Sequence, residues 1–289
     1  MHAAPSTQSI EPGSGGTAES ELPRFEFGAN WRRFLDDVDE SRISSAMEDL
    51  VDWSRQPSWE GMTFLDAGSG SGLTSLAAHR LGATVTSFDY DPESVATTTE
   101  MRRRFAGDGE RWRIERGSLL DAGFMASLGA YDLVCSWGVP HHTGDMWTAL
   151  DHLGPRVAGD GRLWVALYND AGRSTQRWTR IKHAYVASPR PVRAAIAAVA
   201  LVRAWGPTVG RDALKGHPLR SWREYPHGPK GRGMSPWRDL LDWVGGLPFE
   251  AATPGDVFAF YHVRGFALER LRTVIGPFGC NEFLFSRRP

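Results

Sequence analysis

Three glycines at alternate positions, Gly68, Gly70 and Gly72, follow a short apolar run, and an acid, Asp66, precedes them. Glycine lets the backbone turn sharply and approach a ligand closely, and a helix that starts after the turn presents free N–H groups there. The dinucleotide fingerprint G-x-G-x-x-G requires a glycine at position 73, where this sequence has Leu73. An acid beside the loop also suits a positively charged ligand better than a pyrophosphate. The loop therefore favours a cationic ligand.

A second acid, Asp89, stands 21 residues after Gly68, at the end of the next apolar run. A carboxylate at this position can accept hydrogen bonds from both hydroxyls of a ribose. The alternative is an acid in an exposed turn. Its neighbour Asp91, which precedes Pro92, is interpreted instead as a helix cap.

Two adjacent histidines, His141 and His142, follow the apolar run 131–136. Histidine has the side-chain pKa nearest neutrality, so either could be the general base that takes a proton from an alcohol or phenol. We expect His141 before His142. The alternative is that one of them caps the next helix or shapes the loop. A metal site is disfavoured because no further ligands stand at useful spacing.

Polar residues also follow the run 162–168, where Tyr168 and Asp170 end the next expected strand. An antiparallel strand beside it would bring residues 280–282 (Cys, Asn and Glu) to the same edge. Such a group could hold a hydroxyl or amine of a substrate, with Tyr168 and Asp170 as candidate catalytic residues. The alternative is a hydrogen-bonded network that only fixes the strand ends.

Alternating strands and helices must position these residues. Two amphipathic helices are expected between residues 25 and 53, ahead of the first strand. Strands are expected over 62–67, 84–89, 112–115, 131–136 and 162–168, with helices over 72–81, 92–105 and 144–153 between them. The alternation predicts an α/β fold with a parallel sheet covered on both faces. A helix from Thr253 and strands 266–274 and 282–285 complete it, the last strand antiparallel.

These motifs resemble motif I and the ribose-binding acid of class I S-adenosylmethionine-dependent methyltransferases. The similarity is greatest to the small-molecule branch, which includes the methylases of ubiquinone and menaquinone biosynthesis. It implies a Rossmann-like three-layer sandwich with a seven-stranded, mostly parallel sheet of order 3-2-1-4-5-7-6, strand 7 antiparallel. It also implies S-adenosyl-L-methionine as the cofactor, with adenine held by the loop after the third strand and Trp31 covering the ligand. The residues it assigns to the cofactor are Trp31, Asp66, Gly68, Ser69, Gly70, Gly72, Asp89, Tyr90, Ser118, Leu119 and Ser136.

The charge of the chain is unevenly distributed. The formal net charge is −1, yet residues 171–240 hold 14 Lys and Arg against three acids. This stretch also carries Trp178, Trp205, Trp222 and Trp237, and interrupts the strand–helix alternation. Within it, 191–202 is apolar and predicted helical, and 207–236 is expected to contain long loops because of its prolines and glycines. Two interpretations of this basic stretch remain. It could form a surface that faces an anionic partner, or it could only neutralise the acidic remainder of the chain.

The expected organisation has three parts. Residues 1–22, rich in Ser, Gly and Pro, are predicted to be a disordered tail. Residues 23–170 and 253–289 form the methyltransferase core, and 171–252 are a basic insertion that acts as a substrate lid or an oligomer element. With no signal pattern and no run of 18 apolar residues, we expect a cytoplasmic protein without a membrane span.

The function expected is O-methylation of a small-molecule acceptor that is anionic, glycosylated or amphipathic. The insertion follows strand five and so lies on the acceptor side, where it could cover a lipid-linked substrate, contact a membrane peripherally or form a homodimer. A nucleic-acid methyltransferase acting on RNA is the alternative, supported only by the basic insertion. No Asn-Pro-Pro-Tyr-like tetrapeptide is present for methylation of a base amino group. The intact glycine loop and Asp89 argue against a scaffold without activity. Leu73, at the position of the third fingerprint glycine, argues against a nicotinamide oxidoreductase.

Overall fold

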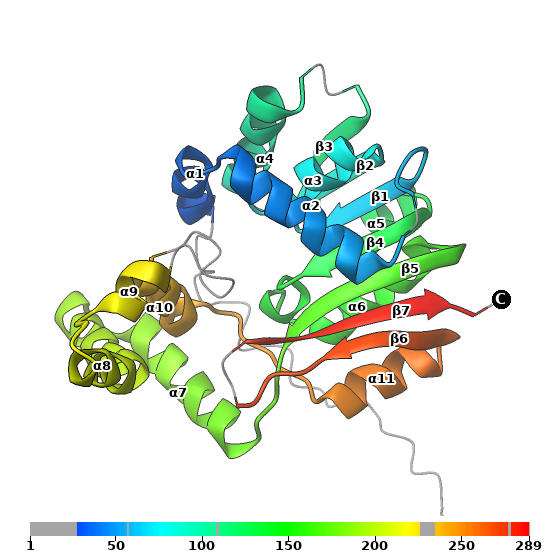
Figure 1. Cartoon of the computed structure of the whole chain (residues 1–289). Coiled ribbons are helices and arrows are strands. Elements are labelled where there is room, and N and C mark those ends of the chain that lie inside the picture. The colour runs from blue at the N-terminus through cyan, green and yellow to red at the C-terminus, as the bar shows by residue number, and fades with distance from the viewer. Residues whose placement is uncertain (1–27, 57, 108–109, 226–234, 277–278, 289) are drawn as a thin grey trace, which may run out of the picture.

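A single seven-stranded sheet of order β3-β2-β1-β4-β5-β7-β6 organises the computed structural model (Figure 1). The structure describes residues 28–56, 58–107, 110–225, 235–276 and 279–288. Neighbouring strands pair in parallel from β3 to β5, and β7 pairs antiparallel with both β5 and β6. The strands are β1 (Thr63–Ala67), β2 (Thr84–Asp89), β3 (Trp112–Arg116), β4 (Tyr131–Trp137), β5 (Val157–Tyr168), β6 (Phe266–Arg272) and β7 (Cys280–Arg287).

Helices cover both faces of the sheet, so the predicted three-layer fold is confirmed (Figure 1). On one face α2 and α3 bury Ile43, Leu50 and Leu76 against the sheet. On the other face α6 and α11 bury Leu150 and Tyr261. The helices of this part are α1 (Gly28–Asp36), α2 (Glu40–Ser54), α3 (Leu73–Leu81), α4 (Pro92–Phe105), α5 (Ala122–Ser127), α6 (Met146–Leu153) and α11 (Pro254–His262).

The predicted caps fix where two of these helices begin. The Asp91 side chain accepts from the Glu93 N–H at the start of α4, and the Thr253 side chain accepts from the Asp256 N–H at the start of α11. Each cap satisfies a donor that the helix itself leaves unpaired and is followed by proline in the first turn.

The basic insertion is more helical than its composition predicts. It forms α7 (Arg173–Ala187), α8 (Arg190–Leu214), α9 (Arg220–Glu224) and α10 (Pro236–Gly245), which extend to the left of the sheet in Figure 1. The expectation of long loops from residue 207 is wrong for the first part of that segment, because α8 continues through Pro207 to Leu214. Pro207 is exposed, so water can solvate the carbonyl that its missing N–H leaves unpaired.

One helix among the described residues, α8, is long and apolar enough to cross a membrane by length and composition, with a mean hydropathy of 1.3. Its arginines, Arg193 and Arg203, interrupt the run of apolar residues that the sequence criterion requires. The predicted tail 1–22 lies outside the described residues, and the proposed division into core and insertion stays a prediction.

Candidate active site

The glycine loop lies where β1 ends and α3 begins, in the left-handed backbone region. Gly68, Gly70 and Gly72 have φ of +91°, +53° and +79°. The N–H groups of Gly68 and Ser69 donate to the Phe88 carbonyl at 2.9 and 3.0 Å, which ties the loop to the end of β2. Side chains other than glycine rarely adopt such φ values, so the three glycines are required by the turn itself.

Close neighbours also exclude side chains at these glycines. A Cβ on Gly68 would lie 2.5 Å from Val139, and one on Gly72 would lie 2.9 Å from Thr98. The Thr98 hydroxyl is also 3.0 Å from that of Ser69. The loop is therefore held on one side by α4 and on the other by the segment after β4.

Asp89, at the end of β2, is bonded to the loop. Its carboxylate accepts from the Gly70 N–H at 2.9 Å and from the Asp91 N–H at 2.9 Å. Burial raises the pKa of Asp89, an effect that these N–H groups oppose. The Tyr90 N–H acts on the same carboxylate. A carboxylate has about four acceptor positions, so backbone N–H groups take three of them and about one remains for a ligand.

Asp66 is a buried acid beneath the loop. Its carboxylate accepts from the Ser75 hydroxyl at 2.5 Å, and only 4% of the residue is exposed. Burial raises the pKa of Asp66 to about 6; the Ser75 bond opposes this shift and the charge of Asp89 adds to it. Two carboxyls with raised pKa values thus share the crevice.

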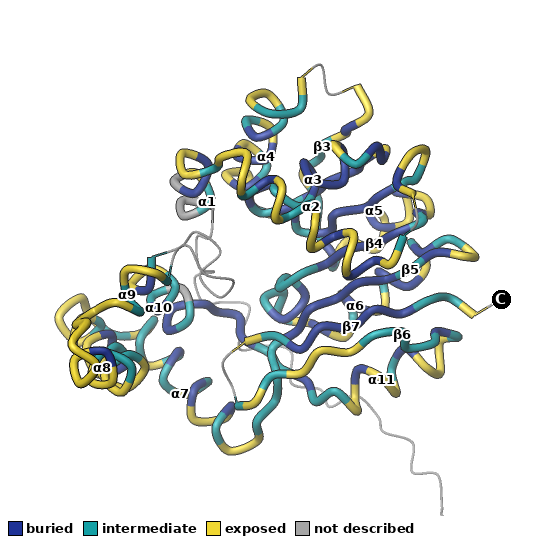
Figure 2. The backbone as a smooth tube through the Cα atoms, in the orientation of Figure 1, coloured by how far each residue is buried: buried dark blue, intermediate teal, exposed yellow. Residues whose placement is uncertain are grey.

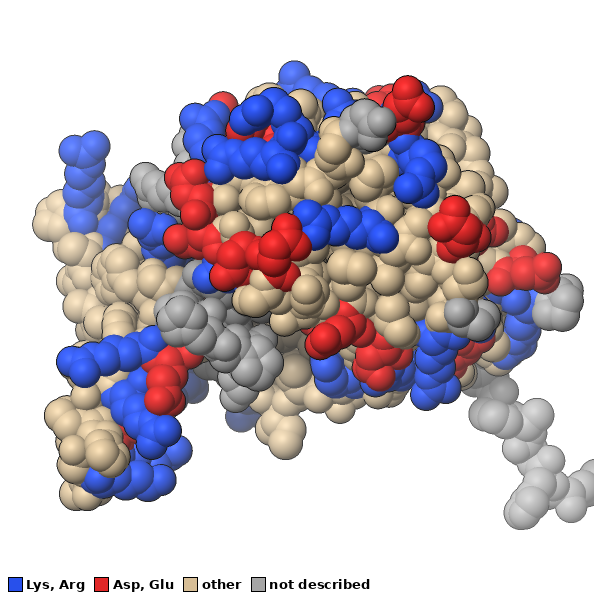
Figure 3. Space-filling model, turned by 45° about the horizontal axis from the view of Figure 1, so that its top comes forward, with Lys and Arg blue, Asp and Glu red and all other residues tan. Residues whose placement is uncertain are grey.

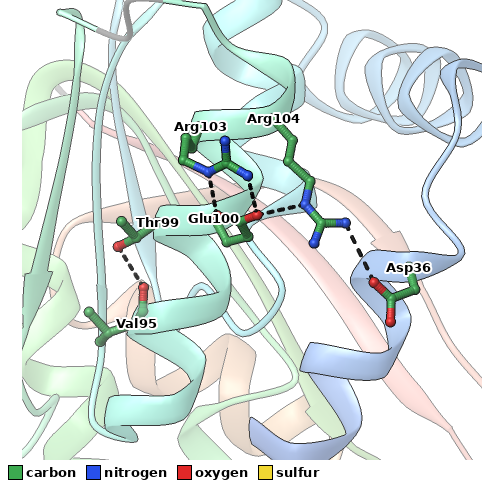
Figure 4. Close-up of polar contacts among 6 residues, drawn as sticks. All are labelled: Asp36, Val95, Thr99, Glu100, Arg103 and Arg104. Carbon is green, nitrogen blue, oxygen red and sulfur yellow. Dashed lines mark hydrogen bonds and ion pairs between the residues drawn. The ribbon is translucent and has the colours of Figure 1, made fainter.

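Helix α1 closes the crevice over the loop. The Trp31 ring lies against Gly70, where an added Cβ would be 3.1 Å from the indole. Ion pairs hold α1 to α4: Arg32 with Glu93, and Asp36 with Arg104 at 3.5 Å (Figure 4). These pairs are exposed and so add little stability, but they fix the side of the loop on which Trp31 lies.

Four further residues assigned to the cofactor lie around this crevice in different environments. Tyr90 is 54% exposed, whereas Leu119 is buried in the core beneath the β3 loop. The Ser118 hydroxyl accepts from the Leu120 N–H at 3.1 Å, and the Ser136 hydroxyl donates to the Ala67 carbonyl at 2.8 Å. Both serine hydroxyls therefore stabilise the strand ends, and their predicted contacts with a cofactor stay predictions.

The two histidines lie in a short 3-10 turn, Pro140–His142, after β4. The Tyr168 N–H donates to Nδ1 of His141 at 3.2 Å, so the proton of neutral His141 sits on Nε2. Nδ1 of His142 lies 2.8 Å from the Pro248 carbonyl and must be the donor, so the lone pair of neutral His142 is on Nε2. In the neutral forms the Nε2 atom of His142 is therefore an acceptor and that of His141 a donor, and which of the two acts as a base stays a prediction.

Burial keeps both rings neutral. It lowers the pKa of His142 to about 4, although the Pro248 carbonyl acts in the opposite direction. It also lowers the pKa of His141 well below its ordinary value, with His142 and Lys182 adding to the effect. Nε2 of His141 is buried and has no hydrogen-bond partner within the described part of the chain. A buried N–H of this kind is costly unless a ligand accepts from it.

Tyr168 of β5 packs against this pair, and aromatic side chains of the insertion pack against Tyr168. The Tyr168 ring lies 3.8 Å from that of His141, and the rings of Trp243 and Phe249 lie 5.1 and 5.3 Å from that of Tyr168. Lys182 of α7 is fully buried, with Nζ 4.4 Å from the Trp243 ring and a hydrogen bond to the Trp243 carbonyl. The insertion therefore builds one wall of the site.

The predicted polar edge beside β5 is only partly assembled. Cys280 stands opposite Tyr168, and the Asn281 amide donates to Asn169 at 2.9 Å. The Glu282 carboxylate pairs with Arg272, and a role for Glu282 in binding an acceptor stays a prediction. Glu282 lies opposite Ala166 in the ladder, two positions before Tyr168, where Arg272 of β6 is within reach.

Asp170 has a local hydrogen bond of its own. Its carboxylate accepts from the Gly172 N–H at 2.8 Å, in the turn that leads into α7. Its own N–H donates to Ala252, which returns from the insertion alongside β5. A role in catalysis stays a prediction.

Comparison with known proteins identifies the domain that carries this site. Residues 65–163 match a family described as a methyltransferase domain. About a third of the chain thus resembles a methyltransferase domain. The matched segment includes the glycine loop, Asp89 and both histidines, so the crevice lies within it.

One relative found by sequence comparison is named after the biosynthesis of a small molecule. The ubiquinone biosynthesis O-methyltransferase of Paramagnetospirillum magneticum is 31% identical over 120 residues, which are 42% of this chain and 45% of that protein. The chain thus spans less than half of this relative.

Solved structures show the same fold. Magnesium protoporphyrin IX methyltransferase from Synechocystis PCC 6803, crystallised with bound SAH, has a TM-score of 0.54 at 16% identity, covering 90% of this chain and 93% of that one. An O-methyltransferase family protein from Burkholderia thailandensis has a TM-score of 0.51 at 15% identity, covering 90% and 61%.

The sequence analysis did not predict that side chains of the insertion pack beside the histidine site. Trp243, Phe249 and Lys182 were not singled out, although Trp243 lies in the insertion with the other tryptophans. The apolar spacing within residues 240–249 gives a usable signal, since Leu240, Val244 and Phe249 are all buried. The partners of these residues lie far away in sequence, so spacing alone does not show what they contact.

Proposed function

We propose that this chain is an S-adenosylmethionine-dependent methyltransferase that methylates an oxygen of a small-molecule acceptor. One observation carries the proposal: a glycine loop bonded to the Asp89 carboxylate and a turn with two neutral histidines follow β1 and β4, which are adjacent parallel strands, so both lie at the same edge of the sheet. In open α/β sheets ligands bind at this edge, beyond the carboxyl ends of the strands. The names of two of the proteins that this chain resembles, both O-methyltransferases, support the same class.

The crevice residues fit this cofactor. S-adenosylmethionine carries a sulfonium and an ammonium group, and the crevice contains two carboxyls, Asp66 and Asp89, whose pKa values burial has raised. A cation between them would restore their charged forms. Asp89 keeps an acceptor position for a ribose hydroxyl, and the Trp31 ring, which lies against Gly70, would cover the ligand.

The acceptor side supplies proton transfer and shielding. The bound cofactor supplies an electrophilic methyl group. Nε2 of His142 accepts the proton of an acceptor hydroxyl as the oxygen becomes nucleophilic. The N–H of His141 donates to the acceptor and orients it, while Tyr168, Trp243 and Phe249 exclude water that would compete for the base.

The acceptor class is proposed from the insertion. Its cations and tryptophans suit an anionic, glycosylated or amphipathic acceptor, because Arg and Lys bind carboxylates and phosphates and aromatic rings pack against apolar groups. Peripheral membrane contact is a further proposal for the same segment.

The test is transfer of tritiated methyl groups from S-adenosylmethionine to a protein-free extract of small molecules, with total RNA assayed in parallel. We expect label in small molecules. Resistance of the label to mild alkali distinguishes methyl ethers of alcohols and phenols from methyl esters of carboxylates, which need no base. Label in RNA alone would favour the nucleic-acid alternative and refute the small-molecule assignment.

A further inference from the structure

The outward face of α8 is apolar over most of its length. The helix packs inward through Ile196, Ala200 and Leu201, which join a cluster with α7 and α10. On the other side Val199 and Val202 are 70% and 69% exposed (Figure 2). Further exposed residues continue this stripe at helical spacing: Pro191, Val192, Ala195, Ala198 and Gly206. At 1.5 Å per residue the 25-residue helix is about 37 Å long.

Exposed cations lie beside this stripe, at Arg203, and at its two ends. Arg190, Arg203, Arg211 and Lys215 are all exposed along or just beyond α8. The sole acid in the sequence of α8, Asp212, accepts from the Ser221 N–H at 2.7 Å and from its hydroxyl at 2.9 Å. Figure 3 shows Lys and Arg side chains beside an uncharged surface at the lower left of the molecule, where the insertion extends. An apolar stripe bordered by cations is the pattern of helices that lie in a membrane interface.

The packing of α8 decides between lying in a membrane and crossing one. Helix α7 precedes it and α9 follows it, and both pack against it. The rings of Trp205 in α8 and Trp222 in α9 are 4.9 Å apart. A crossing helix would separate these neighbours on opposite sides of the bilayer, whereas an in-plane helix keeps all of them.

Charge argues against a second copy of the chain as the occupant. Two such stripes packed on each other would bring their bordering arginines close together, and like charges in contact are unfavourable. Anionic lipids would instead neutralise them, at about 1 kcal/mol per Lys or Arg near the surface.

We propose that α8 docks the protein in the plane of an anionic lipid bilayer, with Val199 and Val202 inserted and the bordering cations at the headgroups. This docking does not depend on the proposed methyl transfer. It places the insertion, and with it Trp243 and Phe249, at the membrane surface.

Sedimentation of the full chain with vesicles tests this docking. One set contains phosphatidylcholine alone and the other contains phosphatidylcholine and phosphatidylglycerol at 3:1. We expect binding at least tenfold tighter to the anionic vesicles, weakened by salt. The double variant V199D/V202D should lose at least tenfold of that binding. The matched control is V263D, since Val263 is 77% exposed at the end of α11, outside the insertion.

Circular dichroism establishes that each variant is folded, and the exposure of all three valines makes folding of the variants the expected result. The proposal is overturned if the wild type binds neither vesicle, or if folded V199D/V202D binds as tightly as the wild type. It is equally overturned if light scattering shows a dimer that V199D/V202D converts to a monomer while vesicle binding is absent.

Discussion

The two halves of the candidate site use burial in opposite ways. In the cofactor crevice burial raises the pKa of Asp66 to about 6, and in the acceptor pocket burial lowers the pKa of His142 to about 4. Desolvation disfavours the charged form in both cases. In the protein without ligand, both the Asp66 carboxyl and the His142 ring are therefore shifted towards their neutral forms. The two halves differ in the charge state that ligand binding requires. The acids gain a charge when a cation binds, whereas the histidines must remain neutral to accept a proton or donate a hydrogen bond.

The largest effect is expected on the acceptor side, from H142N. The asparagine amide can keep the hydrogen bond to the Pro248 carbonyl but lacks the basic nitrogen at the Nε2 position. General base catalysis contributes about 10²–10⁴-fold, so kcat for forming alkali-resistant methyl ethers should fall by that factor, measured by tritium transfer. Affinity for S-adenosylmethionine should not change. A normal kcat in H142N would reduce His142 to an anchor of the loop.

On the cofactor side, D89N should weaken S-adenosylmethionine binding. Hydrogen bonds to a charged group contribute about 1.5–3 kcal/mol, which is roughly 10- to 150-fold in Kd, measured by titration calorimetry. The asparagine oxygen can still accept from the Gly70 N–H, so the loop is retained. The matched control is D91N, which keeps the helix cap and should bind the cofactor like the wild type. Equal affinities of D89N and D91N for S-adenosylmethionine would show that Asp89 does not bind the cofactor.

The affinity for S-adenosylmethionine should also depend on pH. Because the cationic ligand favours the ionised acid, affinity should rise up to tenfold per pH unit as pH approaches 6 from below and level off above it. Calorimetry from pH 5 to 8 measures this, and D66N should lose most of the dependence. An identical pH profile in D66N and the wild type would contradict the proposed role of Asp66.

The smallest expected effect is on the free energy of unfolding. Its dependence on pH has opposite signs for His142 and Asp66. Between pH 6.5 and about 4 the unfolded chain binds a proton at His142 that the folded chain does not, so this residue makes the free energy of unfolding fall as pH falls. Between about pH 6 and 3.8 Asp66 acts in the opposite direction, because the folded state holds its proton. Each effect is limited to about 1.4 kcal/mol per pH unit.

Denaturant titrations of the two variants separate these contributions. Relative to the wild type, H142N should lose less stability on acidification, and D66N should gain less. The same pH slope in all three proteins would show that neither group shifts on folding.

The sheet was predictable because its signals are local. Apolar runs that alternate with capped helices predicted where the strands lie, and the caps at Asp91 and Thr253 were correct. The order of the seven strands came from the resemblance to class I methyltransferases. The helical course of α8 through Pro207 was not predicted, since the cost of proline in a helix depends on whether water reaches the freed carbonyl.

The cofactor crevice was also more predictable than the acceptor pocket. Gly70 and Asp89 lie within one strand–helix–strand unit, and their spacing alone places them together. His142 is oriented by Pro248, more than 100 residues away, and Trp243 and Phe249 come from the same distant segment. Which nitrogen of each histidine carries the proton follows from these contacts, so the sequence could name the pair but not assign its roles.

The most direct test is a crystal structure of the protein grown with S-adenosylhomocysteine. We expect the adenosyl group between the glycine loop and β2, with a ribose hydroxyl within hydrogen-bonding distance of Asp89 and the Trp31 ring over the loop. A crevice that stays empty at saturating ligand, or that accepts a nicotinamide dinucleotide in its place, would contradict the proposed methyltransferase function.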